Sequence, residues 1–347
     1  MRFAMNKFLP FLILLCVATL FAQNRVIAYF PHWAQYSQFT PKDVRYDFVT
    51  DIRYGYLTPS GSELLFADES DKENFLALVS QAKAAKVKLT VAVGGLGSEA
   101  AMKEAYESKK LAEAVKKFQK EYGVGAFELD GGAISADELP KLLKQAEDLA
   151  NDGVIVSLAV PGTESLAKAV SGADLSKIDN FSLWFTDDAS ANDPQVKPNS
   201  NTSDNIKILA AFASAGVPKN KLVPIIPFYG KTFYKSKGLG SSHQGAGSGN
   251  DGVLPYKEIM EKFNKKGTYS VSFDESSKSE VAVSENETIV FNGIPSVKAI
   301  TEAVKSNGYG GVAAFDISGD RKESIISLLV TIGQVLRPEI DYKKKKK

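Results

Sequence analysis

Residues 124–132 read Val-Gly-Ala-Phe-Glu-Leu-Asp-Gly-Gly, an apolar run that ends in two alternating carboxylates and a pair of glycines. A short apolar run bounded by glycine predicts a buried β-strand, here 124–130. Similar runs recur along the chain, separated by segments rich in Ala, Lys, Glu and Leu, which favour helices. The predicted strands are 26–30, 48–56, 87–94, 124–130, 154–160, 181–185, 222–228 and 311–315, and the predicted helices include 71–85, 104–122, 136–151, 204–215 and 296–306.

The alternation of strands and helices predicts an α/β fold with a parallel sheet, and eight such strands predict a (β/α)8 TIM barrel. Few charges interrupt the strands, which fits a sheet that is buried on both faces. The interval between the last two predicted strands is far longer than the others, and three short strand-like runs lie within it. We therefore predict one barrel over 23–337, with a small α+β insertion at about 235–293, between strands seven and eight.

The first 22 residues have the pattern of a secretory signal peptide. Arg2 and Lys7 precede an apolar run at 8–21, and the small residue Ala22 ends it. We predict that this segment is removed and that the protein is secreted, to the extracellular space or, in a bacterium, to the periplasm. Cys16, the one cysteine of the sequence, would leave with it, so the mature chain would have no disulfide and no thiolate nucleophile.

The charge balance changes once both ends of the chain are set aside. The 347 residues contain 42 Lys and Arg against 41 Asp and Glu. Without Arg2, Lys7 and the five lysines Lys343–Lys347, 35 basic residues remain, so the body is acidic. An acidic body argues against a nucleic-acid binder. The basic tail, 338–347, is expected to be solvated, with adhesion to an anionic surface as its functional alternative.

In a TIM barrel the active site lies at the carboxyl ends of the strands. Here these ends carry aromatic residues beside carboxylates, a combination that suits sugars, whose ring faces stack while their hydroxyls bond carboxylates. Only His32 and His243 are imidazoles, so we predict no metal site and no cofactor. The candidate residues are Tyr29, Trp33, Tyr56, Gly95, Glu128, Asp130, Thr186, Asp187, Tyr229 and Phe315.

Five segments, taken in order, resemble glycoside hydrolase family 18, the chitinase and chitinase-like group. The resemblance covers residues 25–337, and the ordered set supports it more than any single motif does. It implies a TIM barrel that acts on or binds glycans containing N-acetylglucosamine. The segments are YFPHWAQY at 29–36, VAVGG at 91–95, GAFELDGG at 125–132, IIPFYGKTF at 225–233 and GGVAAFDISGD at 310–320.

The resemblance also implies a mechanism, and the sequence departs from it. In the family a DxDxE motif ends the fourth strand: its Glu protonates the glycosidic oxygen, while the Asp before it orients the substrate's own N-acetyl group. In this motif Glu128 and Asp130 take the two Asp positions, and Gly132 takes the position of the acid. Since glycine has no proton to donate, the resemblance implies lost or greatly reduced hydrolysis.

Other positions of the family pattern also differ. Leu96 and Thr186 replace aromatic residues, and Phe315 replaces a Trp but keeps a stacking face, while Asp187 is retained. The resemblance thus assigns remnant catalytic positions to Asp130, Glu128 and Asp187. It assigns glycan contacts to Tyr29, Trp33, Tyr56, Gly95, Thr186, Tyr229 and Phe315.

Three hypotheses of function remain open on the sequence. The favoured one is a chitinase-like protein that binds N-acetylglucosamine-containing glycans with little or no hydrolysis. The second is a glycosidase of altered type that uses Asp130, Glu128 or Asp187, because adjacent carboxylates raise each other's pKa. The third is a scaffold or protein-inhibiting barrel whose mouth is filled by Tyr56, Phe315 and Thr186. Each residue also has a structural alternative: core packing for the aromatic rings and a structural hydrogen bond for Asp130.

Overall fold

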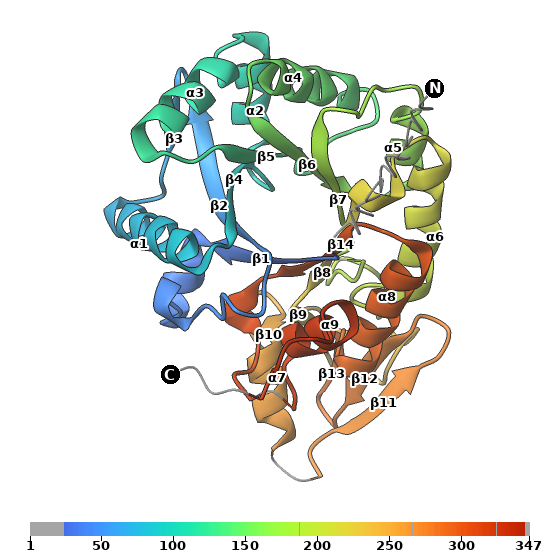
Figure 1. Cartoon of the computed structure of the whole chain (residues 1–347). Helices are drawn as coiled ribbons and strands as arrows, with labels where there is room; N and C mark the ends of the chain where they lie inside the picture. Colours follow the sequence, from blue (N-terminus) through green and yellow to red (C-terminus); the bar gives the residue numbers. More distant parts are fainter. Residues whose placement is uncertain (1–23, 187, 265–266, 324, 344–347) are drawn as a thin grey trace, which may run out of the picture.

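The computed structural model of the chain describes residues 24–343 except 187, 265–266 and 324 (Figure 1). The predicted signal peptide and residues 344–347 of the basic tail lie outside the described residues. Eight parallel strands form a closed barrel, because β1 pairs with β14 on one side and with β2 on the other. The strands are β1 (Arg25–Pro31), β2 (Asp51–Ser60), β4 (Lys88–Gly94), β5 (Ala126–Asp130), β6 (Ile155–Pro161), β7 (Ile178–Trp184), β8 (Leu222–Pro227) and β14 (Gly311–Phe315).

Helices surround the barrel, so the predicted (β/α)8 architecture is confirmed (Figure 1). They are α1 (Glu69–Ala85), α2 (Glu99–Glu107), α3 (Leu111–Tyr122), α4 (Leu139–Asn151), α5 (Glu164–Ala169), α6 (Thr202–Ser214), α8 (Ile294–Asn307) and α9 (Leu328–Leu336). The single helix predicted at 104–122 is wrong: it is two helices, because Lys109 has a φ of 57°, in the left-handed region that interrupts a right-handed helix.

An antiparallel sheet with one helix is inserted between β8 and β14, as predicted, and lies at the bottom of Figure 1. Its strand order is β10-β9-β13-β12-β11. Its elements are β9 (Tyr229–Tyr234), β10 (Val253–Pro255), α7 (Tyr256–Phe263), β11 (Ser270–Asp274), β12 (Ser279–Val283) and β13 (Glu287–Phe291). The remaining elements are β3 (Glu63–Leu65), which forms a hairpin with β2, and the 3₁₀ turns η1 (His32–Ser37), η2 (Pro41–Asp43), η3 (Lys219–Lys221) and η4 (Ile317–Gly319).

Side-chain alternation along the strands divides the interior into two regions. One face of each strand packs against the helices in the main apolar core, which includes Val91, Phe127 and Leu158. The other face points into the barrel, where a small apolar cluster around Ile27 and Val223 lies close to buried polar groups. Within the described residues, no helix has the length and apolar character needed to span a bilayer.

Candidate functional site

Glu128 is a fully buried carboxylate inside the barrel. Tyr29 Oη donates to Glu128 Oε1 at 2.5 Å, and Ser182 Oγ donates to Glu128 Oε2 at 3.3 Å. Arg53 from β2 places Nε 3.5 Å from Glu128 Oε2, and neither side chain of this ion pair is accessible. Burial, together with the nearby charge of Glu128, raises the pKa of Tyr29 well above its usual value, so the phenol stays protonated as a donor.

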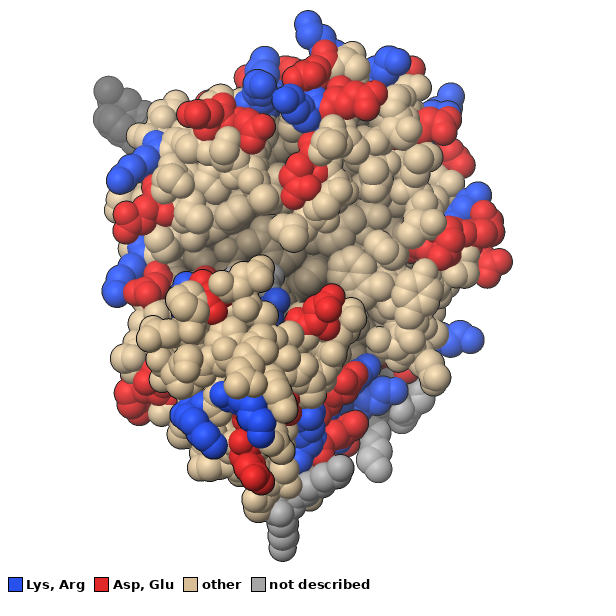
Figure 2. All heavy atoms as spheres, turned by 180° about the vertical axis from the view of Figure 1, so that it is seen from behind, with Lys and Arg blue, Asp and Glu red and all other residues tan. Residues whose placement is uncertain are grey.

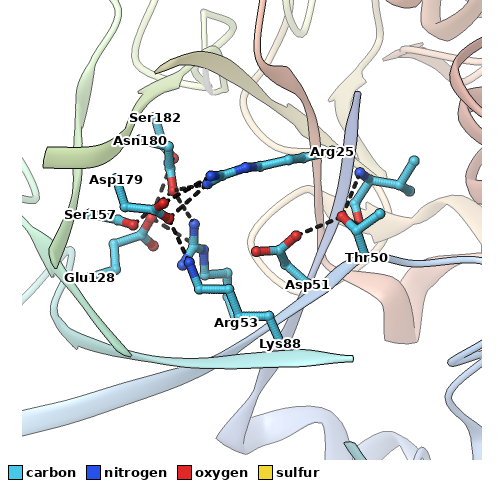
Figure 3. Close-up of polar contacts among 11 residues, drawn as sticks. Arg25, Thr50, Asp51, Arg53, Lys88, Glu128, Ser157, Asp179, Asn180 and Ser182 are labelled. Carbon is cyan, nitrogen blue, oxygen red and sulfur yellow. Dashed lines mark hydrogen bonds and ion pairs between the residues drawn. The ribbon is translucent and has the colours of Figure 1, made fainter. Parts of the chain in front are cut away.

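Polar side chains continue this network toward the amino ends of the strands (Figure 3). Asn180 Oδ1 accepts from Arg53 Nη2 at 2.5 Å and from Ser157 Oγ at 2.7 Å. Further down, Asp179 accepts from Arg25 Nη1 at 2.8 Å and from Lys88 Nζ at 2.5 Å. Because a buried charge without a partner is costly, the Arg53 guanidinium compensates the charge of Glu128.

Asp130, the last residue of β5, lies above Glu128 on the same face of the strand, because side chains alternate with period two. Asp130 is 1% exposed. Its carboxylate accepts from Gly132 N at 2.9 Å and from Trp184 Nε1 at 3.3 and 3.1 Å, and it also bonds Tyr56. Burial and the charge of Glu128 raise the pKa of Asp130 to about 7, although these donors partly oppose the shift.

Five aromatic rings gather around the mouth of the barrel above these carboxylates. Tyr29 is buried, whereas the rings of Trp33, Tyr56, Trp184 and Phe315 are half-buried. Neighbouring ring centroids lie 4.7 Å apart for Trp184 and Phe315, 5.4 Å for Tyr29 and Phe315, and 6.3 Å for Trp33 and Tyr56. Rings that keep one accessible face offer stacking surfaces to a sugar.

Gly95 allows one of these rings to reach its position. A Cβ at residue 95 would lie 2.9 Å from a ring carbon of Tyr56, and the φ of Gly95 is +83°, which L-residues with side chains rarely adopt. The ring of Tyr56 therefore packs directly on the backbone after β4. The neighbouring Leu96 is 84% exposed, so this loop adds no aromatic ring to the mouth.

The loop after β5 has a backbone that suits glycine. Gly132 has a φ of +56°, and a Cβ there would lie 2.9 Å from Glu99 Oε1 and 3.0 Å from the carbonyl oxygen of Gly95. Ala133 N donates to Glu99 Oε1 at 3.4 Å. The N–H groups of Glu99 itself, Gly97 and Ala133 lower the pKa of Glu99, so an ionised carboxylate joins this loop to the start of α2.

Three further predicted site residues, Trp33, Thr186 and Tyr229, follow the carboxyl ends of barrel strands. Trp33 Nε1 donates to Asp316 Oδ2 at 3.3 Å. Thr186 follows β7 and is half-buried. Tyr229 begins β9, its carbonyl oxygen accepts from Asn199 Nδ2 at 2.9 Å, and its ring lies 5.8 Å from Lys231 Nζ. Asp187 lies outside the described residues, and within those residues no group of three or more His, Cys, Asp or Glu is arranged to hold a metal.

The sequence prediction missed three side chains that shape the site: Trp184, Arg53 and Glu99. The position of Trp184 could have been predicted from the sequence. It follows Asn180 and Ser182 at period two on β7, so it lies on the same face of the strand, at the carboxyl end. Arg53 was detectable as a charge inside an apolar strand. Glu99 gave no such indication, because its role depends on contact between the start of α2 and the loop after β5.

The face opposite to that of Figure 1 is hollowed near its centre (Figure 2). The hollow lies between the lower lobe, which corresponds to the inserted sheet in Figure 1, and the rest of the barrel. Its surface is mostly uncharged, whereas charged side chains gather at the edge of the molecule. A TIM barrel with this insertion and with carboxylates beneath half-exposed aromatic rings has the architecture of the (β/α)8 glycoside hydrolases.

The family model "Glycosyl hydrolases family 18" matches residues 25–320, so the chain belongs to this family. The resemblance drawn from the sequence is thereby confirmed. Among curated relatives, Chitinase 1 of Aphanocladium album is 23% identical over 86% of this chain and 83% of its own length. The endochitinase of Manduca sexta is 25% identical over 86% of this chain and 64% of its own length.

Solved structures share the fold at low identity. The Group IV chitinase of Ostrinia furnacalis aligns with a TM-score of 0.80 and 20% identity, over 90% of this chain and 99% of that one. A human protein described as a pseudo-chitinase with retained chitooligosaccharide binding properties aligns with a TM-score of 0.79 and 15% identity, over the same shares. Both catalytic and non-catalytic proteins therefore use this architecture.

Proposed function

We propose that the chain is a secreted, chitinase-like protein that binds N-acetylglucosamine-containing glycans, with lost or greatly reduced hydrolysis. The observation that carries the proposal is the loop after β5, where Gly132 stands at the position that the family resemblance assigns to the acid. Relatives named as chitinases and a structural neighbour named as a chitooligosaccharide-binding pseudo-chitinase support the glycan class. The half-exposed rings at the mouth supply the stacking surface that such a glycan needs.

The loss of hydrolysis is supported by two features of this loop. Gly132 has no side chain, and general acid catalysis is worth roughly 10²–10⁴ in rate. The carboxylate that fills the adjacent space, Glu99, has a lowered pKa and is ionised at neutral pH, so it does not replace the proton donor. Both features weigh against an active chitinase of the usual type.

One observation favours a second candidate, a glycosidase of altered type. The raised pKa of Asp130, about 7, leaves a protonated carboxyl group available near neutrality. Its 1% exposure weighs against direct contact with a glycosidic oxygen. A turnover assay on N-acetylglucosamine polymers, compared with the Asp130→Asn variant, separates the two candidates. Hydrolysis that disappears in the variant would establish the enzyme and overturn the binding-only proposal.

The third candidate, a scaffold with a closed mouth, is weakened by the accessible rings. Trp33, Tyr56, Trp184 and Phe315 each keep exposed surface, and Thr186 is also half-buried and does not seal the mouth. Isothermal calorimetry with chito-oligosaccharides tests the first proposal directly. We expect binding with a favourable enthalpy, and no heat at roughly millimolar ligand, the weak end of specific binding, would leave the scaffold as the better description.

Secretion and the role of the tail are parts of the same proposal. The pattern of residues 1–22 supports export, and a mature N-terminus at Gln23, read by mass spectrometry of the exported protein, is the expected result. Lys343–Lys347 is proposed to adhere to anionic surfaces such as acidic glycans. Truncation after Tyr342 should then lower retention on a heparin column without changing calorimetric binding of chito-oligosaccharides at the barrel mouth.

A further inference from the structure

Trp184 covers the carboxylate at the centre of the mouth. It is the last residue of β7, and its indole N–H points at both oxygens of Asp130, at 3.3 and 3.1 Å. The ring is held on two sides, edge-on to Phe315 with centroids 4.7 Å apart and tilted against Tyr29 at 5.6 Å. This position is fixed by packing as well as by the hydrogen bond.

Asp130 consequently has little left to offer a ligand. Its oxygens already accept from Gly132 N, Trp184 Nε1 and the Tyr56 side chain, and its 1% exposure leaves no path for a further donor. An ionised carboxylate has about four lone-pair sites, and here protein donors take most of them. A ligand amide N–H would reach this carboxylate only if the indole moved aside.

Among the residues that the structure describes, the other carboxylates next to the rings are also engaged by the protein. Glu128 is paired with Arg53 beneath the mouth. Asp316 accepts from Trp33 Nε1 at 3.3 Å and from Ser318 N at 2.8 Å. Neither of them is left to recognise the acetamido N–H of an N-acetylglucosamine residue, which is the group that distinguishes chitin from an unsubstituted β-1,4-glucan.

Four aromatic rings keep accessible surface at the mouth, those of Trp33, Tyr56, Trp184 and Phe315. Ring faces stack on the apolar face of a pyranose, which is formed by C–H groups of the sugar ring. These C–H groups are the same whether C2 carries a hydroxyl or an acetamido group. Stacking alone therefore gives affinity for the sugar chain with little discrimination at C2.

We propose that Trp184 is a specificity-determining residue: by covering Asp130 it makes the barrel mouth bind β-1,4-linked pyranose chains through their ring faces, without selecting for the acetamido group at C2. The proposal rests on the proposed glycan binding and extends its ligand class to unsubstituted β-1,4-glucans.

The test compares chitohexaose with cellohexaose by isothermal calorimetry, because the two share length and linkage and differ at C2. We expect dissociation constants within about threefold of each other, less than the roughly tenfold that one recognised buried polar group gives. A preference for chitohexaose of about tenfold or more overturns the proposal. Absence of binding to both ligands refutes the proposed function itself, a result distinct from equal or unequal binding.

Two substitutions assign the effect to Trp184. Trp184→Met removes the cover, and it should raise the preference for chitohexaose about tenfold by exposing Asp130. Trp184→Phe keeps a ring but removes the N–H, and should move the ratio in the same direction by less. The smaller change also protects the test if the Met variant fails to fold. An unchanged ratio in a folded variant overturns the proposal.

Trp33→Phe is the matched control. Trp33 lies in the same mouth but donates to Asp316 and not to Asp130. The change shortens a stacking surface and leaves the cover on Asp130 in place. Asp316 loses the Trp33 donor but still accepts from the backbone N–H and the hydroxyl of Ser318, so the change should weaken both ligands by similar factors. A shift of the ratio equal to that of the Trp184 variants would show that any loss of ring area changes selectivity, which would refute the specific role of Trp184.

Discussion

Substitution of Gly132 tests whether the loop after β5 can accept a side chain at all. The φ of +56° is left-handed, and a non-glycine residue held in such a conformation costs about 1–3 kcal/mol. A Cβ would also approach Glu99 Oε1 at 2.9 Å and the Gly95 carbonyl oxygen at 3.0 Å. The Glu99 side chain can swing away at little cost, whereas the Gly95 carbonyl belongs to the backbone and cannot.

The chain offers a matched control for the backbone contribution. Gly61, in the turn between β2 and β3, has a φ of +57°, and a Cβ there would meet nothing within 4 Å. Gly61→Ala should therefore show the conformational cost alone, about 1 kcal/mol, and Gly132→Ala should exceed it by the crowding against Gly95. Urea denaturation measures both free energies of unfolding. Equal values for the two variants would refute the crowding that we infer at position 132.

The same geometry bears on restoring the acid. At this φ the Cβ of a Gly132→Glu variant would point at the loop between β4 and α2. We therefore expect the variant to be less stable and to show no hydrolysis of N-acetylglucosamine polymers. Adding Glu99→Ala should recover only the part of the stability lost through contact between residue 132 and the Glu99 side chain, and not the part lost through the backbone conformation or the Gly95 carbonyl. Measurable turnover by Gly132→Glu alone would show that the loop readily adopts a catalytic conformation, against the present account.

Three further predictions concern the interior and the mouth. Arg53→Met should lower the free energy of unfolding by about 3–5 kcal/mol, because it leaves the buried carboxylate of Glu128 without its ion-pair partner. Adding Glu128→Leu should restore most of this loss, as measured by urea denaturation. If the costs of the two substitutions simply added, the buried ion pair would be contradicted. Burial raises the pKa of Asp130 to about 7 from 3.8, so its contribution to stability is present below about pH 4 and is lost as the pH rises through 7. Asp130→Asn should therefore gain stability relative to the wild type as the pH rises from about 4 to about 7. Free energies of unfolding that change in parallel with pH in the two proteins would argue against the shift. Gly95→Ala should displace the Tyr56 ring, 2.9 Å from the new Cβ, and weaken chito-oligosaccharide binding in calorimetry, whereas unchanged affinity would remove Tyr56 from the site.

Most of the fold follows from patterns that are local in the sequence. Apolar, β-branched runs mark the barrel strands, and the long interval before the last strand marks the insertion. The error at 104–122 arises where local composition and tertiary packing disagree. Composition favours helix throughout this segment, but the turn at Lys109 depends on how α2 and α3 each pack on the barrel, which composition does not report.

The site was predictable along strands and much less so between them. Period-two alternation on β5 places Glu128 and Asp130 on one face, as the structure has them. Which groups meet these carboxylates depends on the register of neighbouring strands, so the contacts of Arg53 and Trp184 were not predicted. The contact of Glu99 with the loop at 132–133 depends on the conformation of that loop, which is even harder to predict from local sequence patterns than strand register is.

The placement of the tryptophans has a practical consequence. The sequence contains two, Trp33 and Trp184, and both line the barrel mouth, where their ring nitrogens donate to Asp316 and Asp130. Ultraviolet emission from indole therefore reports on this one region of the molecule, free of background from the helices or the inserted sheet. Replacing either residue by phenylalanine leaves a single indole, so that solvent relaxation can be followed separately at each of the two positions.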